Sequence, residues 1–84
     1  MNDGEKLIKR IRSLSNIEQI IFSYHERSGS AQCHIDIYTA EKSDYLATDF
    51  TTLEQLTEFA AQTKKAVGSD SVKYLIKKVV ISQL

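Results

Sequence analysis

The sequence has no proline, no tryptophan and only three glycines, and its single cysteine is Cys33. One cysteine cannot form an internal disulfide, and glycines scattered at Gly4, Gly29 and Gly68 do not make a phosphate-binding loop. No apolar run approaches the roughly 18 residues of a membrane span, and the first residues form no apolar signal core. We therefore expect a cytoplasmic protein that binds neither membranes nor a cofactor.

Charge of neither sign prevails, because 11 lysines and arginines balance 11 aspartates and glutamates. A general electrostatic attraction to nucleic acid is therefore not expected. The charges are segregated along the chain: residues 1–12 and 64–78 are net positive, whereas residues 36–58 contain six acids and one lysine. With 42% hydrophobic and 26% charged residues, the composition predicts one folded domain spanning residues 1–84.

Three extended runs between about residues 17 and 50 predict a three-stranded antiparallel meander. The first, 17–26, is rich in β-branched and aromatic residues and precedes a polar turn around Gly29. The second, 32–39, alternates between apolar and polar side chains, and the third, 44–50, follows a polar break at 40–43. The alternation predicts one set of core-facing residues: Phe22, Tyr24, Cys33, Ile35, Ile37, Leu46 and Phe50.

The same alternation predicts a register, because a shift by one residue would turn every side chain to the opposite face. Phe22 is expected opposite Ile37, and Ile37 opposite Leu46. The polar face would then consist of three cross-strand rows, which are Ile21, Tyr38 and Tyr45; Ser23, Asp36 and Ala47; and His25, His34 and Asp49.

Helices are predicted on both sides of the meander. From Asp3 to Leu14 the apolar residues recur with the spacing of one helical stripe, and the opposite face is basic. A second helix is expected to begin at Thr51, because Thr51 and Glu54 fit the pattern of a capping box. Gly68 is well placed to end that helix in a left-handed conformation.

The tail after Asp70 supports two interpretations. Its density of valine, isoleucine and tyrosine favours a strand centred on residues 79–81, and a short helix over residues 71–77 is the alternative. Taking the strand, the predicted fold is α+β with element order α-β-β-β-α-β. We expect an antiparallel sheet with both helices on one face.

The predicted row of His25, His34 and Asp49 contains the side-chain types of a non-haem iron or zinc site. The usual short ligand spacings are missing, and an exposed sheet does not enclose a metal, so we interpret the two histidines as surface residues. Cys33 falls on the core face, where a thiol behaves as a small hydrophobe rather than a nucleophile. The open sheet would also leave Asp36 and Asp49 solvated. We predict no enzymatic activity and no metal site.

The polar face instead suits a protein partner, because tyrosines and an isoleucine rimmed by acids and histidines are typical of protein interfaces. The partner would be another protein or a second copy of this chain in a homodimer. The alternative is a small nucleic-acid-binding protein that uses the basic helix and the C-terminal lysines. The predicted partner-binding residues are Ile21, His25, His34, Asp36, Tyr38, Tyr45 and Asp49.

Residues 47–56, with the sequence ATDFTTLEQL, lead a predicted strand into a capped helix. This junction and the order of the elements resemble the architecture of small inhibitor proteins of phages and mobile elements, anti-CRISPR proteins among them. The resemblance implies a stoichiometric inhibitor that covers a basic nucleic-acid-binding surface with acidic residues. From the composition of the polar sheet face and the acidic middle segment, we predict a non-enzymatic protein-binding or regulatory module that uses both; the version that the resemblance implies is a small inhibitor protein of a phage or mobile element.

Overall fold

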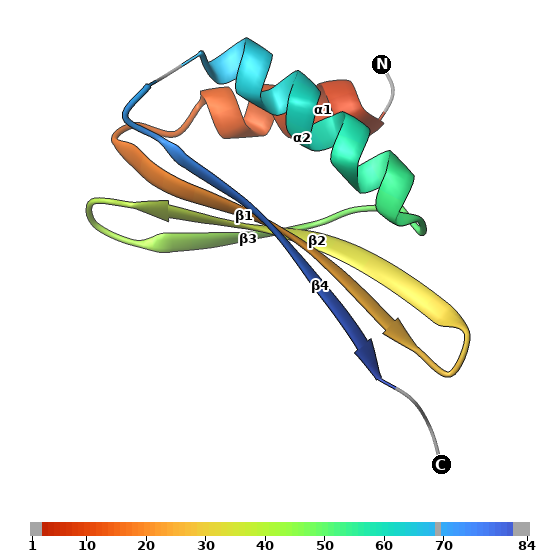
Figure 1. The fold of residues 1–84 in the computed structure, drawn as a ribbon. Helices are drawn as coiled ribbons and strands as arrows, with labels where there is room; N and C mark the ends of the chain where they lie inside the picture. The colour runs from red at the N-terminus through yellow and green to blue at the C-terminus, as the bar shows by residue number, and fades with distance from the viewer. Residues whose placement is uncertain (1–2, 69, 82–84) are drawn as a thin grey trace.

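The computed structural model describes residues 3–68 and 70–81. Within these ranges the elements are α1 (Asp3–Arg12), β1 (Ile17–Arg27), β2 (Ser30–Thr39), β3 (Ser43–Ala47), α2 (Leu53–Val67) and β4 (Lys73–Ile81). The strands form one sheet in the order β3-β2-β1-β4, and both helices lie over the same face of it (Figure 1). The predicted α+β class and element order are confirmed.

The sheet is mixed, so the prediction of a purely antiparallel sheet is wrong for its last strand. β1 pairs antiparallel with β2, and β2 pairs antiparallel with β3, but β4 pairs parallel with β1. The reason is the connection, because α2 returns the chain to the end of the sheet where β1 begins. A helical crossover is the usual link between strands that run in the same direction. β1 is therefore an inner strand, and β3 and β4 are the edges.

The tail forms a strand from Lys73 to Ile81, so the alternative of a helix over 71–77 is wrong. Pairing with β1 extends from Lys73 to Ile81, well before the predicted centre at 79–81. The adjacent Lys77 and Lys78 obscured the alternation in the sequence. On an edge strand they point to opposite faces, and both side chains are exposed.

The predicted registers are wrong by two residues, although the faces are right. Phe22 pairs with Ile35 rather than Ile37, because the hairpin loop consists of Ser28 and Gly29. Both loop residues have positive φ, 53° and 82°, as tight two-residue hairpins require. Leu46 also pairs with Ile35 rather than Ile37, because the four-residue turn begins at Thr39. A displacement by an even number leaves each side chain on its predicted face.

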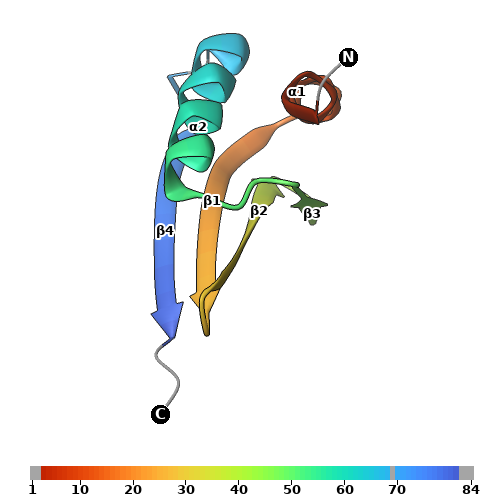
Figure 2. The same ribbon diagram turned by 90° about the vertical axis from the view of Figure 1, so that its right-hand side faces the viewer.

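The core lies between the helices and the sheet (Figure 2). Phe22 of β1 meets Phe59 of α2 edge to face, with 6.1 Å between the ring centroids. The seven predicted core-facing residues all belong to this layer: Leu46 and Phe50 are partly buried, and Phe22, Tyr24, Cys33, Ile35 and Ile37 are buried. The helices add Ile11, Leu56, Phe59 and Ala60, and β1 adds Ile20.

The start of α2 differs from the prediction by one residue. Thr52, not Thr51, is the N-cap; its hydroxyl accepts a hydrogen bond from the Gln55 amide at 3.1 Å. The Gln55 side chain accepts in return from the Thr52 amide at 3.2 Å, which completes a capping box with Gln55 in the role predicted for Glu54. The end of α2 is confirmed, since Gly68 has φ 60°.

The helices cover only part of the sheet. The tip of the β1–β2 hairpin and the end of β4 extend beyond α1 and α2 in Figure 1. α2 lies on the β4 side and α1 on the β3 side in the turned view of Figure 2. No helix in the described ranges is long and apolar enough to cross a membrane.

Candidate interaction face

We call the side of the sheet away from α1 and α2 the open face, and the other side the helix face. The observed register assigns side chains from all four strands to the open face. They are Gln19, Ile21, Ser23, His25 and Arg27 of β1; Ser30, Gln32, His34, Asp36 and Tyr38 of β2; Ser43, Tyr45 and Ala47 of β3; and Lys73, Leu75, Lys77, Val79 and Ile81 of β4.

Three aromatic rings form a diagonal stack across the open face. Tyr45 of β3 stacks on His34 of β2 with 4.9 Å between ring centroids and 28° between the ring planes. His34 stacks in turn on His25 of β1, at 5.1 Å and 17°. Each contact joins residues one row apart on neighbouring strands, a diagonal that long aromatic side chains can bridge. Tyr45, at the outer end of the stack, is 65% exposed.

A hydrogen bond fixes the central ring of this stack. His34 Nε2 lies 3.0 Å from Asp36 Oδ2, two residues further along β2 on the same face. Because a carboxylate only accepts hydrogen bonds, the Nε2 proton is the donor. Asp36 thereby orients His34. The carboxylate of Asp36, which lies opposite Tyr45 on β3, gains a polar partner in His34.

The predicted rows are wrong in their membership. Ile21 pairs with Asp36 and not Tyr38, and Ser23 pairs with His34 and not Asp36. The structure still brings His25 and His34 together, as diagonal neighbours instead of opposite partners.

Asp49 does not join the two histidines. β3 ends at Ala47, and Asp49 follows in the segment that leads to α2, where it lines hollows beside both helices. The segment leaves the sheet because Thr48 turns back on β2: its hydroxyl donates to the Cys33 carbonyl at 2.7 Å and accepts from the Phe50 amide at 3.2 Å. In residues 3–68 and 70–81, no three His, Cys, Asp or Glu side chains gather as a metal site would require.

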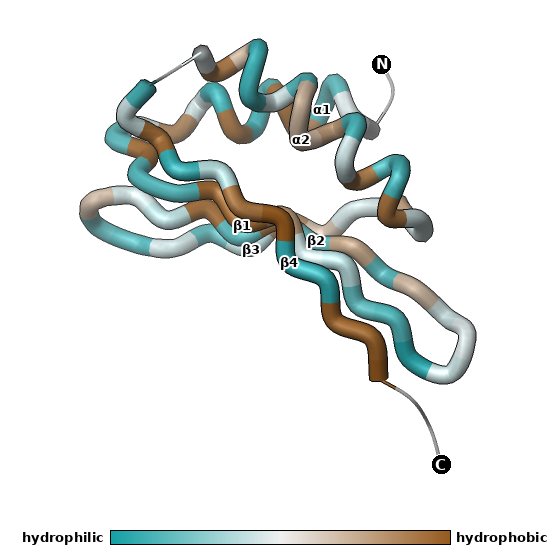
Figure 3. The backbone as a smooth tube through the Cα atoms, viewed as in Figure 1, coloured by the Kyte–Doolittle hydropathy of each residue, from teal (hydrophilic) through white to brown (hydrophobic). Residues whose placement is uncertain are grey.

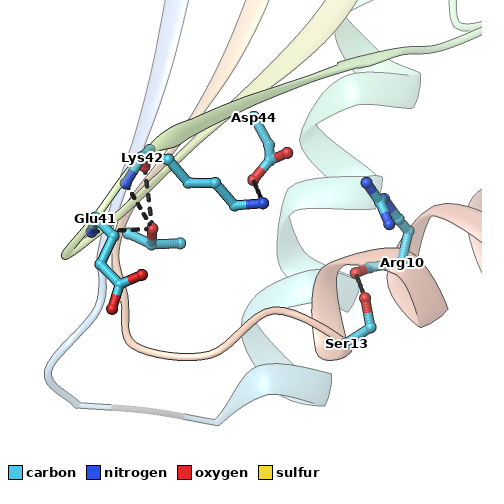
Figure 4. A network of polar contacts seen from close by, with 6 residues as sticks. Arg10, Ser13, Glu41, Lys42 and Asp44 are labelled. Carbon is cyan, nitrogen blue, oxygen red and sulfur yellow. Dashed lines mark hydrogen bonds and ion pairs between the residues drawn. The ribbon is translucent and has the colours of Figure 1, made fainter.

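The acidic middle segment does not form one surface. Asp36 lies on the open face, but Asp44 pairs with Ile37 on the helix face, where its Oδ2 is 3.7 Å from Lys42 Nζ (Figure 4). Glu54 and Glu58 are exposed on α2. The acids are therefore distributed over three parts of the molecule.

β4 contributes an apolar and basic part of the open face that the sequence analysis did not include. Leu75 pairs with Ile21, Lys77 with Ser23, and Val79 with His25. Ser23 lies between His34 and Lys77 in one cross-strand row. The two longer side chains leave it only 2% exposed. A strict alternation of lysine and apolar residues along β4 would have predicted which of its side chains share the open face. The adjacent Lys77 and Lys78 interrupt that alternation.

Ser23 on the open face and Cys33 on the helix face are both buried. Ser23, His34 and Asp36 are the residue types of a hydrolytic triad, but the burial of Ser23 keeps its hydroxyl away from a substrate. Cys33 is 3% exposed, and burial raises the pKa of its thiol, which disfavours the reactive thiolate. A hollow of about 680 Å³ lies beside the stack, and the residues that line it include His25, His34, Tyr45, Arg27 and Ile81.

Comparisons of this chain with protein-family models, with curated proteins and with solved structures found no match.

Proposed function

We propose that this protein is a cytoplasmic, non-enzymatic protein-binding module whose partner docks on the open face. The observation that carries the proposal is the stack of Tyr45, His34 and His25 on a sheet surface that neither helix covers. Aromatic residues are enriched in protein interfaces because they bury a large area with few rotatable bonds.

Exposure along the face supports this role. Tyr45 and Tyr38 are 65% and 39% exposed, so a partner that covers them removes aromatic surface from water. Leu75 and Ile81 extend the apolar part of the face onto β4. Asp36 and Lys77 supply charge of both signs around this centre, an arrangement that favours one orientation of the partner.

The version in which the protein inhibits a nucleic-acid-binding partner has less support from the charges. It requires a continuous acidic surface, whereas Asp36, Asp44 and Glu58 lie on different parts of the molecule. Asp49 and Glu58 do line one hollow beside α2, which is where a basic partner would bind if that version holds.

Single-stranded nucleic acid is the second candidate, favoured by one observation. The register of β4 puts Lys73 and Lys77 on the same face as the aromatic stack. Stacked rings cover one another, however, so His34 has no free ring face on which a base could stack. The basic residues of α1 lie on the opposite side of the sheet and cannot bind the same strand.

The test compares two double variants in affinity capture from a lysate of the source organism. Tyr38→Ala/Tyr45→Ala removes aromatic surface from the open face, and Ala61→Ser/Lys65→Ala changes two exposed residues of α2 as a matched control. We expect a protein that wild type and control retain and that the open-face variant loses. Equal capture by both variants would contradict docking on the open face. Nuclease-sensitive capture, with salt-dependent binding of a labelled oligonucleotide that Lys77→Ala weakens, would favour the second candidate.

A further inference from the structure

The edge strand β4 carries four large apolar side chains that are about half exposed. The exposed fractions are 49% for Leu75, 49% for Ile76, 50% for Val80 and 47% for Ile81. Leu75 and Ile81 lie on the open face, and Ile76 and Val80 lie on the helix face. Figure 3 shows the apolar end of β4 where the sheet extends beyond the helices. An edge strand with these properties, and with no proline or bulge along it, is a template for another strand.

We propose that β4 of a second copy of this chain pairs antiparallel with this edge, with Lys78 at the centre of symmetry. The apolar residues are spaced symmetrically about that position, because Leu75 and Ile81 lie three residues away from it and Ile76 and Val80 lie two residues away. Leu75 would then face Ile81 of the second copy, and Ile76 would face Val80 of the second copy.

This pairing covers both faces of the edge at once. Directly opposite residues of an antiparallel pair point to the same side, so the Ile76–Val80 contacts lie on the helix face and the Leu75–Ile81 contacts on the open face. A self-complementary pattern is what a two-fold symmetric interface requires. The binding of an unrelated strand would need no such symmetry.

Neighbouring registers match the side chains less well. With Lys77 at the centre, Ile76 would face Lys78 and Ile81 would face Lys73 of the second copy. With Val79 at the centre, Val80 would face Lys78 and Ile81 would face Lys77. Only the register centred on Lys78 opposes all four exposed apolar residues to one another within the described part of β4.

Two lysines would meet at the centre of this dimer. Lys78 would lie opposite its own counterpart, and like charges opposite one another destabilise a strand pair. Glu26 lies close by on the same face, because it pairs with Val80, and it accepts a hydrogen bond from Tyr24, the residue that pairs with Lys78. The carboxylate of Glu26 offsets part of the repulsion between the two lysines.

Disulfide cross-linking of the full chain tests the register. In the Lys78→Cys variant the two introduced thiols face each other, and the buried Cys33 provides an unreactive background. In the Val80→Cys control the two thiols lie about 13 Å apart along the strands, too far to join. We expect a linked dimer from Lys78→Cys alone, none from Val80→Cys alone, and linkage when Ile76→Cys and Val80→Cys are mixed. Equal cross-linking of Lys78→Cys and Val80→Cys would overturn the register.

Sedimentation equilibrium tests the dimer without substitutions at its centre. Val80→Lys should raise the dissociation constant about tenfold or more, since it puts a charge against Ile76 of the second copy. Ala40→Lys, which adds the same charge at an exposed position in the turn between β2 and β3, should leave the dissociation constant unchanged. A wild-type chain that stays monomeric at millimolar concentration, or a Val80→Lys variant that dimerises like wild type, would overturn the proposal. Neither result bears on docking at the open face, which the capture experiment tests separately.

Discussion

The imidazole of His34 stacks on the phenol ring of Tyr45, with 4.9 Å between the two centroids. The two residues come from different strands, so their contact reports the register of β2 with β3. In the register predicted from the sequence, Tyr45 would lie opposite Tyr38, and His34 would be far from it along the sheet.

Removal of the Tyr45 ring should therefore change the environment of His34 without unfolding the protein. In Tyr45→Ala, we expect the His34 ring-proton resonances to move as ring-current shielding is lost, and stability to fall by only about 0.5–1 kcal/mol. Proton NMR of the histidine rings measures the first effect, and urea unfolding measures the second. Tyr38→Ala is the control and should leave the His34 resonances in place. Unchanged resonances in Tyr45→Ala would mean that the stack is absent.

The N-cap of α2 provides a comparison of adjacent threonines. Thr52→Ala removes the hydroxyl that accepts from the Gln55 amide, and we expect a loss of about 1 kcal/mol from the free energy of unfolding. Thr51→Ala should change that free energy by less than about 0.5 kcal/mol, because Thr51 is exposed and only its backbone amide contacts Gln55. Chemical denaturation distinguishes the two; an equal loss in both variants would argue against Thr52 as the cap.

Phe59 anchors α2 to the sheet. Its ring is 1% exposed and contacts both Phe22 and Phe50, at 6.1 Å and 5.2 Å between centroids. Phe59→Ala should lower the free energy of unfolding by about 3–5 kcal/mol, through lost burial and the cavity left behind. The exposed Gln62 of the same helix is the control, and Gln62→Ala should change it by less than about 0.5 kcal/mol. A loss below about 2 kcal/mol for Phe59→Ala would indicate that this core is loosely packed.

Alkaline pH should destabilise the fold through Cys33. Burial raises the pKa of the thiol above its ordinary value of 9.0, so at higher pH the unfolded chain releases a proton that the folded chain retains. The contribution of the protonated Cys33 thiol to the free energy of unfolding is complete below pH 9.0, the ordinary pKa that the unfolded chain has. This contribution is lost as the pH rises toward the pKa of the thiol in the folded protein. The slope from this group is at most about 1.4 kcal/mol per pH unit.

The Cys33→Ala variant isolates this contribution. We expect it to be less stable than wild type at neutral pH, because a buried side chain becomes smaller, but to lose less stability between about pH 9 and pH 10. The pKa values of Tyr24 and Tyr74 are also raised, by the hydrogen bond to Glu26 and by burial respectively, and both act above their ordinary value of 10.0. Parallel pH profiles for the two proteins, from urea unfolding, would contradict the role of Cys33.

The alternation in the sequence determined which side chains face the core. Phe22, Ile35 and Ile37 are buried on the predicted side, because a strand has a side-chain period of two and any shift by an even number preserves the faces. The end of α2 at Gly68 was also determined by local sequence, since the positive φ that ends a helix favours glycine at that position. The α+β class follows from such local patterns.

The tertiary structure decided which residues meet. The hairpin loop at Ser28 and Gly29 set the register of β1 with β2, and a change of one residue in the loop position moves every partner by two. The side on which β4 pairs, its parallel direction and its exposed apolar edge depend on contacts with β1, about fifty residues earlier in the chain. The alternation fixes the pairing only to within an even shift, and it carries no information about which strand lies next to which. The turns and the crossover therefore decided two features: the stack of His25, His34 and Tyr45, and the position of Asp49 away from the two histidines.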